Sequence, residues 1–454
     1  IWKTNNITIN LGKGAIPGDF NGDGIVELIN TSGQVWRFVT SGNPGQLLAS
    51  VTNGHNQKTL FEYAPLVASS GIYDKGAAAV YPVINLAGPM YALKTITRDN
   101  GSLAQTAANY SYSGGKVHLQ GKGFLGFSGM TVKNTTMKTE IKTVNTFHPE
   151  YFLPSETETK TFIDNNPVPV STVSNTFTAG SISGKHVYMY LRQQKQTDMY
   201  GNTVTTVHTF NTSQGYATKD STDHGGGTST VVRYSGHDNV SGYPGTVETT
   251  RVHPDDPLNP FKTKTTYEYD PAKGHIIKKT ENAHTATPLT TGYVYDIYGN
   301  RTSSRVSAAD VETMTYHQEY DATRRFVTRT YTTPASAAHV FEYDKWGNVT
   351  KEKDGTNTAD TLVTSHDYDG WGRRTLTTLP DGREISYQVS WNTGPPDPLK
   401  RYYTHVQGDD TPWVRTWYDA AGRETIAESI GPKGLSIKTT NTYNNKGELT
   451  LTSS

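Results

Sequence analysis

The sequence predicts an all-β protein made of repeated hairpins, and three observations support this prediction. The chain of 454 residues contains 28 Tyr, 43 Gly and 22 Pro, a composition that suits half-buried pleated surfaces joined by many turns. A Tyr-Asp pair that is followed by two further residues and then Gly recurs about every 25 residues in the second half. Between the copies, apolar and polar residues alternate as in strands with one buried face. No segment of useful length has helical periodicity.

The composition also excludes several classes of protein. Lys and Arg number 42 and so do Asp and Glu, so no general basic field attracts nucleic acid. The absence of Cys excludes a disulfide scaffold, a zinc–thiolate site and a cysteine nucleophile. Aromatic residues at 11% argue against disorder. The most apolar stretch, residues 76–93, is interrupted by Pro82, Asn85 and Pro89, so we expect no membrane span.

An acidic, glycine-containing loop near the start predicts one calcium site. Oxygen ligands at alternate positions, with a main-chain carbonyl among them, can wrap a Ca²⁺ ion that takes six to eight oxygens. No helical pattern flanks the loop, so it is not predicted to be an EF-hand; the competing interpretation is a solvated turn. The candidate ligands are Asp19, Asn21, Asp23, Ile25 (through its carbonyl) and Glu27.

The repeat itself predicts a turn. Asp in the first position accepts backbone N–H groups, and Gly in the fourth takes a positive φ. The main copies place these roles on Tyr295, Asp296 and Gly299; Tyr343, Asp344 and Gly347; Tyr368, Asp369 and Gly372; and Tyr418, Asp419 and Gly422. Further or weaker copies occur at Tyr269-Asp270, Tyr320-Asp321, Tyr443-Asn444 and, earlier, at residues 198–202.

Each repeat is therefore predicted to be a hairpin of about 25 residues. A single hairpin is marginally stable in water, so the copies must stack edge to edge into one long sheet. Such a sheet twists, and over many strands it must coil or close around a space. Arg301, Arg373 and Arg423 follow the turn glycines, and we expect each guanidinium to pack on the aromatic ring of the next turn.

Catalytic motifs are absent from the sequence. No His-Glu-x-x-His or Gly-x-Ser-x-Gly segment occurs, so neither zinc hydrolysis nor a nucleophile elbow is supported. The glycine-rich segment 224–227 lacks the Lys-Ser/Thr ending of a phosphate loop and is predicted to be a hairpin tip. We predict no catalytic residue in this chain.

The Tyr-Asp copies resemble the YD repeats of bacterial Rhs proteins, which teneurins share. A second resemblance concerns a segment that is similar to a signature of SpvB and of insecticidal toxin-complex B subunits (TcdB-like proteins). This segment is Gly-Lys-Gly-Phe-Leu-Gly-Phe and contributes Gly121, Gly123, Phe124, Gly126 and Phe127. The calcium loop is similar to those of propeller repeats of the FG-GAP or VCBS type, which often precede this region in the family.

The resemblance implies the domain order and the function. Residues 1–40 are expected to end a calcium-loop β segment, 41–160 to form an SpvB/TcdB-like middle region and 161–454 to form an Rhs/YD-repeat wall. In such families the wall coils into a hollow shell that encloses a C-terminal toxic polypeptide. The implied partners are a toxin cargo encoded downstream or on a partner subunit and a delivery apparatus or pore-forming subunit. The implied location is the bacterial surface or the exterior.

The chain departs from the family at one point. Asp397-Pro398-Leu399 resembles the end of a self-cleaving aspartyl protease segment, but Lys400 stands where Gly is expected and the segment lies inside the repeat array. We therefore expect the release machinery outside this chain. The sequence starts and stops inside repeating patterns, which suggests part of a longer protein.

Two other functions remain open at this point. One is a teneurin-like extracellular adhesin or glycan-binding β-shell that uses exposed aromatic residues. The other is a toxin with its own enzymatic activity, although nothing here resembles a catalytic domain.

Overall fold

The structure is a computed structural model. It describes residues 14–18, 20, 26–37, 47–54, 57–67, 70–86, 88–99, 105–182, 186–309, 311–334, 338–355, 362–395, 397–409, 411–431 and 434–454. In these residues the regular structure is almost entirely β-strand and no α-helix occurs. The described segments therefore also contain no apolar helix long enough to cross a membrane.

The chain divides into two compact units. The first comprises residues 1–177 with 195–202 and 443–448, and the second comprises 178–194, 203–442 and 449–454. A small sheet in the first unit contains β1 (Ile16–Gly18), β2 (Glu27–Ile29) and β3 (Val35–Arg37). The remaining strands up to β13 are β4 (Ser50–Thr52), β5 (Lys58–Leu66), β6 (Tyr73–Asp74), β7 (Val83–Asn85), β8 (Gly88–Asp99), β9 (Gln105–His118), β10 (Gly123–Asn134), β11 (Thr139–Phe147), β12 (Pro154–Ile163) and β13 (Ser171–Ile182).

The strands from β14 onward build most of the second unit. They are β14 (His186–Asp198), β15 (Thr203–Asn211), β16 (Tyr216–Gly225), β17 (Thr228–Ser235), β18 (Thr246–Val252), β19 (Phe261–Tyr269), β20 (Ile276–Glu281), β21 (Leu289–Tyr295), β22 (Arg301–Ala308), β23 (Val311–Tyr320), β24 (Val327–Thr333), β25 (Ala338–Tyr343), β26 (Val349–Gly355), β27 (Leu362–Tyr368), β28 (Arg374–Thr378), β29 (Glu384–Trp391), β30 (Tyr402–Gly408), β31 (Val414–Tyr418), β32 (Glu424–Ile430), β33 (Ser436–Tyr443) and β34 (Leu449–Ser453).

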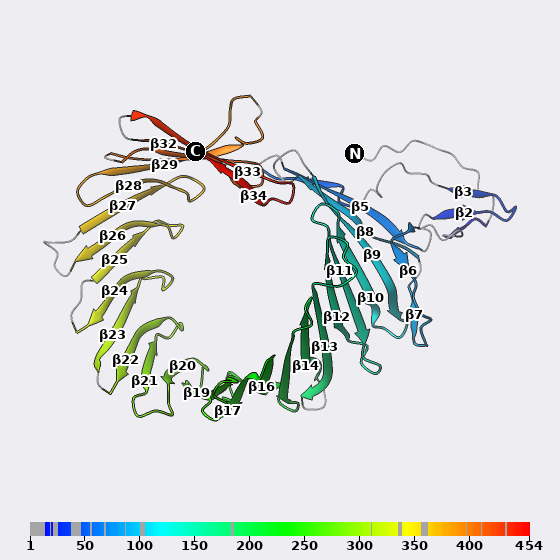
Figure 1. Cartoon of the computed structure of the whole chain (residues 1–454), viewed down its shortest axis with the longest axis horizontal. Coiled ribbons are helices and arrows are strands. Elements are labelled where there is room, and N and C mark those ends of the chain that lie inside the picture. The colour runs from blue at the N-terminus through cyan, green and yellow to red at the C-terminus, as the bar shows by residue number, and fades with distance from the viewer. Residues whose placement is uncertain are drawn as a thin grey trace. The chain divides into compact units, whose positions relative to one another are not determined.

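In the second unit each strand pairs antiparallel with the next one along the chain. Figure 1 shows strands β19 to β28 following one another in this order along a curved path. Connections in such a meander alternate between the two ends of the strands. Every connection from an odd-numbered strand to the next even-numbered strand therefore lies at the same end of the strands. The prediction of an all-β fold with hairpins in a long antiparallel sheet is confirmed.

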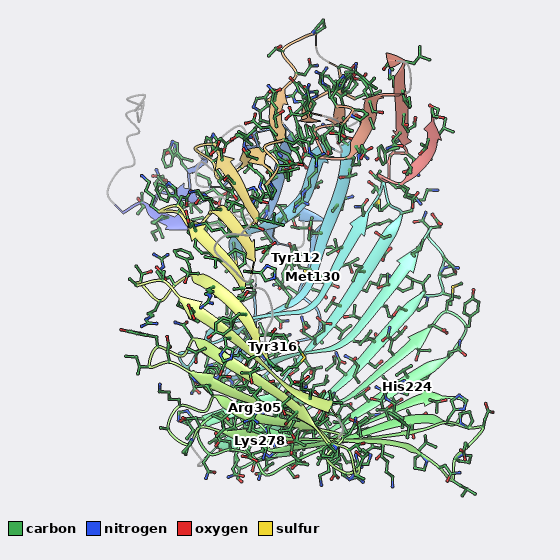
Figure 2. All side chains as sticks on the ribbon, turned by 90° about the vertical axis from the view of Figure 1, so that its left-hand side faces the viewer. Tyr112, Met130, His224, Lys278, Arg305 and Tyr316 are labelled. Atoms are coloured by element: carbon green, nitrogen blue, oxygen red, sulfur yellow. The ribbon has the colours of Figure 1, made fainter. Side chains whose placement is uncertain are left out.

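The two faces of this sheet carry different side chains. One face, here called the charged face, contains ion pairs between directly opposed residues, such as Lys264–Glu248 at 2.9 Å and Lys278–Glu268 at 2.7 Å. Arg305 lies on the same face as Lys278, separated from it by Gly292 (Figure 2). Exposed pairs of this kind each contribute about 0–1 kcal/mol. Their main effect is on the strand register, because each pair favours one alignment of the two strands.

The opposite face, here called the tyrosine face, carries rings and hydroxyls. Tyr293, Ser304 and Tyr316 are aligned across three neighbouring strands, and Figure 2 shows the position of Tyr316. Neither face is a continuous apolar surface. In the described part of the chain, the buried apolar side chains are Ala64, Leu66, Val67, Ile72, Tyr73 and Ile426.

Candidate functional site

The repeat turns have a common geometry, which Asp344 illustrates. Its Oδ1 accepts the N–H groups of Trp346 at 2.8 Å and Asn348 at 3.0 Å, and its Oδ2 accepts the Asn348 side-chain amide at 2.8 Å. Gly347 adopts φ +93° and donates its N–H to the Asp344 carbonyl at 3.1 Å. One carboxylate therefore fixes the backbone of the whole turn.

The other copies repeat this arrangement. In each, an Asp carboxylate accepts the N–H groups two and four residues later, and the Gly has φ between +76° and +90°. The copies are Asp198 with Gly201, Asp296 with Gly299, Asp369 with Gly372 and Asp419 with Gly422. Asn444 occupies the same place before Gly447, which has φ +86°.

These hydrogen bonds change the ionisation of the aspartates. The side-chain amide of Asn348 and then the backbone N–H groups of its turn lower the pKa of Asp344 from its ordinary value. The Arg373 N–H is the main cause of the lowered pKa of Asp369. Asp321 is held at a pKa of about 2, chiefly by the Thr323 hydroxyl and the Phe326 N–H. In these three turns the fold therefore favours the ionised carboxylate.

The tyrosine of each repeat connects its hairpin to the preceding one. Tyr343 donates its hydroxyl to the carbonyl of Val327 at 2.6 Å, and Tyr368 donates to Val349 at 2.8 Å. Val327 and Val349 are the first residues of β24 and β26, the second strands of the preceding hairpins. The same bond joins Tyr295 to Ile276 and Tyr320 to Arg301. Tyr418 instead stacks on Tyr402, with ring centroids 4.9 Å apart.

The turn glycine is needed for close approach as well as for its φ. A Cβ on Gly347 would lie 2.6 Å from the Phe326 ring of the preceding turn. A Cβ on Gly299 would lie 3.1 Å from His275. At both positions the preceding turn packs against a glycine that has no side chain, so successive turns are in direct contact with each other.

The predicted stacking of arginine on the next turn is wrong for the copies that the structure describes. Arg373 and Arg423 place Nε 2.6 and 2.7 Å from Oδ2 of Asp369 and Asp419 in their own turns. Arg301 lies 6.0 Å from the Tyr293 ring in its own hairpin. For Arg373 and Arg423, the second carboxylate oxygen of the turn carries a full opposite charge within hydrogen-bonding distance, so an ion pair forms within the turn.

Sequence reasoning overlooked one turn of the same type. Asn30 accepts the N–H groups of Ser32 at 3.0 Å and Gln34 at 2.9 Å, and Gly33 has φ +76°. No tyrosine precedes Asn30, so the search for Tyr-Asp pairs missed it. The Asn-x-x-Gly spacing was the available signal.

The signature segment forms a β-bulge beside the core of the first unit. The register between β9 and β10 shifts between Phe124 and Gly126, where Gly126 has φ +117°. Phe127 then packs 4.7 Å from Tyr112 and 6.3 Å from Tyr73, measured between ring centroids. These rings adjoin the cluster of Ala64, Leu66, Ile72 and Tyr73. Gly121 and Gly123 also have positive φ, at +98° and +68°.

A tightly packed hydrogen-bonded group supports that core. Tyr73 donates to the Leu86 carbonyl at 2.7 Å and accepts the Gly115 N–H at 3.2 Å. Burial raises the pKa of Tyr73 and also that of Tyr112. Tyr112 and Met130 face each other across β9 and β10 (Figure 2). The signature residues are therefore placed in packing and backbone roles.

Most of the predicted calcium loop, including Asp19, Asn21, Asp23 and Ile25, lies outside the described residues. Glu27 is described and is 2% exposed, and its Oε2 accepts the Phe20 N–H at 2.9 Å. In the parts of the chain that the structure describes, no group of three or more His, Asp and Glu side chains is placed to hold a metal ion.

Two histidine networks on the tyrosine face were not predicted. His208 Nδ1 lies 2.6 Å from Asp220, which also accepts the Tyr234 hydroxyl at 2.8 Å; burial and then Asp220 raise the pKa of Tyr234 to about 12. His366, 4% exposed, lies between Thr377 at 3.1 Å and Glu352 at 3.3 Å. Thr377 is also 4% exposed, so both partners of this hydrogen bond are buried.

Comparison with known proteins identifies relatives of both regions. The model of the insecticide toxin TcdB middle/N-terminal region matches residues 17–153, and the RHS repeat model matches residues 343–384. The resemblance inferred from the sequence is confirmed in both regions. No curated protein matches the sequence.

Solved structures show the same fold. A crystal structure of TcdB2-TccC3 without its hypervariable C-terminal region matches with a TM-score of 0.57 and 10% identity, covering 94% of this chain and 34% of that one. A crystal structure of TcdB2-TccC3-TEV matches with a TM-score of 0.50 and 12% identity, covering 96% of this chain and 26% of that one. This chain thus spans about a third of the length of the first structure.

Proposed function

We propose that this chain is a non-catalytic section of a toxin-complex shell whose wall separates an enclosed polypeptide from the surroundings. The support is the confirmed resemblance to TcdB and Rhs regions together with the shared fold. In this proposal the cargo is a toxic polypeptide encoded downstream or on a partner subunit. A delivery subunit is the second partner, and the assembly acts outside the producing bacterium.

One observation carries the proposal. Among the described residues of the second unit, Ile426 is the only apolar side chain that is buried. The sheet of this unit carries polar residues on both faces. Most domains cover a sheet with a second layer. A sheet that stays single and polar on both sides has the properties of a wall between two aqueous spaces.

The polar faces also suit an unfolded cargo. A long antiparallel sheet offers few unpaired edges for strand addition. Side chains such as Lys278, Arg305 and Tyr316 leave an enclosed chain no large apolar patch on which to collapse. A wall of this kind confines a polypeptide without binding one particular sequence.

Small-angle X-ray scattering on the purified chain tests the proposal. A filled globule of 454 residues has a radius of gyration of about 22 Å. We expect a clearly larger radius and a pair-distance distribution depleted at short range relative to a filled sphere. A radius near the compact value would mean that the hairpins fold onto a filled core, and the wall function would then be wrong.

We further propose that residues 19–27 bind one Ca²⁺. The support is the ligand pattern in the sequence, which places oxygen-bearing side chains at alternate positions of a short, glycine-containing segment. Chelation should lower the melting temperature of the chain, and Asp23→Asn should remove that response. Identical melting with and without a chelator would overturn the site.

A further inference from the structure

Large aromatic side chains are exposed in the turns at one end of the strands in the second unit. They are Tyr243, Tyr298, Trp346 and Trp371, with 65%, 69%, 78% and 87% of their surface exposed. They belong to the connections β17–β18, β21–β22, β25–β26 and β27–β28. All four connect an odd-numbered strand to the next even-numbered strand, so they lie at the same end of the strands. We call this end of the sheet the turn rim.

The rings on the turn rim are held on rigid supports. Tyr298, Trp346 and Trp371 each precede the turn glycine and donate their N–H to the turn aspartate at 2.8 to 2.9 Å. The turns are also joined to each other: the Asn300 side chain donates to the Arg324 carbonyl of the next hairpin at 2.9 Å. Backbone order is therefore already present before any ligand binds, which reduces the entropy cost of binding.

The spacing of the rings follows from the sheet. Neighbouring hairpins are two strands apart, about 10 Å along the rim. Trp346 and Trp371 stand on adjacent hairpins, and Tyr298 stands two hairpins before Trp346. The intervening turns expose Lys273 and Arg324. The rim thus presents separate rings at repeat intervals with hydrogen-bond donors between them.

This pattern limits the chemistry of a partner. A protein interface needs a contiguous core of several hundred Å², and rings separated by polar turns do not provide one. A polyanion such as single-stranded nucleic acid needs an excess of positive charge along its path. Most cations on the rim share a turn with an aspartate, as Lys273 does with Asp270, Lys345 with Asp344 and Arg373 with Asp369. The turn of Asp321 carries both Arg324 and Arg325, so the excess of positive charge is local and does not run along the rim.

We propose that the turn rim binds an extended neutral polysaccharide, with Trp346 and Trp371 as its main stacking platforms. The apolar C–H face of a sugar ring packs on an exposed aromatic face, and its hydroxyls accept hydrogen bonds from Lys273, Arg324 and Lys345. The rings are separated by one or two hairpin spacings, and multiples of one spacing match a linear polymer whose units repeat. This binding is independent of the wall function, because it uses the turn tips and not either face of the sheet.

Isothermal titration with soluble hexamers of β-1,4-linked glucose and of β-1,4-linked N-acetylglucosamine tests the proposal on the full chain. We expect saturable binding to at least one hexamer that is insensitive to salt. Trp346→Ala combined with Trp371→Ala should weaken it at least tenfold. Both side chains point into solvent, so thermal melting should not change. Tyr298→Ala should cause a smaller loss.

Tyr200→Ala is the matched control. Tyr200 is 81% exposed and sits on the same type of turn beside Asp198, but in the even-to-odd connection β14–β15 at the other end of the strands. Its replacement should leave binding unchanged. Absence of binding to both hexamers, an equal loss in Tyr200→Ala, or salt-dependent binding of oligo(dT) in their place would overturn the proposal. A change of oligomeric state in the double variant would assign the rim to protein contact and overturn it too.

Discussion

A tyrosine hydroxyl that donates to a backbone carbonyl in the preceding hairpin replaces part of the stabilisation that a hydrophobic core would supply. Tyr295, Tyr320, Tyr343 and Tyr368 all do this, at distances of 2.6 to 3.2 Å. The acceptor is always the first residue of a strand, next to a turn, where sheet pairing is beginning. At the scale of single residues, the repeat is therefore a set of side-chain-to-backbone bonds between neighbours.

Removing one such hydroxyl should destabilise the chain by a small and local amount. Tyr343→Phe leaves the Val327 carbonyl without its donor, and we expect a loss of about 1 kcal/mol. Urea unfolding should show a lower midpoint with an unchanged slope. Tyr316→Phe, on the exposed tyrosine face, is the control and should have the wild-type midpoint. Equal midpoints for both variants would contradict the role of the hydroxyl.

The lowered pKa of Asp321 predicts how stability depends on pH. Its folded pKa is about 2 and its ordinary value is 3.8, so the folded state favours the ionised form. The stabilisation is complete above about pH 4 and is lost as the pH falls toward 2. Asp321→Asn should be less stable than wild type at neutral pH, and the difference should narrow between pH 4 and pH 2.

Thermal melting across that range measures the effect. A difference between Asp321→Asn and wild type that stays constant down to pH 2 would contradict the assignment.

At the scale of the element, a turn works only if the next hairpin can reach it. The positive φ of the turn glycine was predictable from the Asp-x-x-Gly pattern, because that conformation belongs to the local turn. The contact between Gly347 and Phe326 was not predictable, because it depends on how far apart two hairpins lie. A similar limit explains the incorrect arginine prediction: the sequence does not show that Arg373 reaches back to Asp369 Oδ2 in its own turn.

Two glycines allow the effect of the positive φ to be measured separately from the effect of the contact with the preceding turn. Gly347→Ala meets both a positive φ and the Phe326 ring, whereas Gly382, with φ +85°, has no atom within 4 Å of its Cβ position. We expect Gly382→Ala to lose about 1–2 kcal/mol from backbone strain alone, and Gly347→Ala to lose clearly more. Chemical unfolding of the two variants measures this. Equal losses would mean that the close approach contributes nothing.

At the scale of the whole molecule, the hairpin array and its polar composition were sufficient to predict an all-β protein with a long sheet. The interval of about 25 residues fixed the hairpin length, and the alternation of side chains fixed the faces. The sequence did not predict that Trp346 and Trp371 are exposed on the turn rim. The aromatic rings of the turns were instead expected to be covered by the arginine side chains of neighbouring turns. The networks at His208 and His366 were also missed, since each forms across strands whose register is set by the fold.

The small number of buried apolar side chains predicts an unusual heat capacity of unfolding. Only six apolar side chains are buried in the residues that the structure describes, and the heat capacity rises on unfolding because apolar surface becomes exposed. The heat capacity change should therefore lie below the usual range of about 12–15 cal/mol/K per residue. Differential scanning calorimetry measures it. A value within or above that range would indicate a filled core.

Each tyrosine bond between hairpins reaches toward the N-terminus, to a carbonyl that has already been synthesised. A hairpin leaving the ribosome therefore finds its acceptor waiting, and it never depends on sequence still to be translated. The same directionality makes the array tolerant of gene duplication: an added pair of strands supplies one new tyrosine and one new acceptor, and every older bond stays as it was. Growth in length, both in a cell and over evolution, then requires no redesign of what came before.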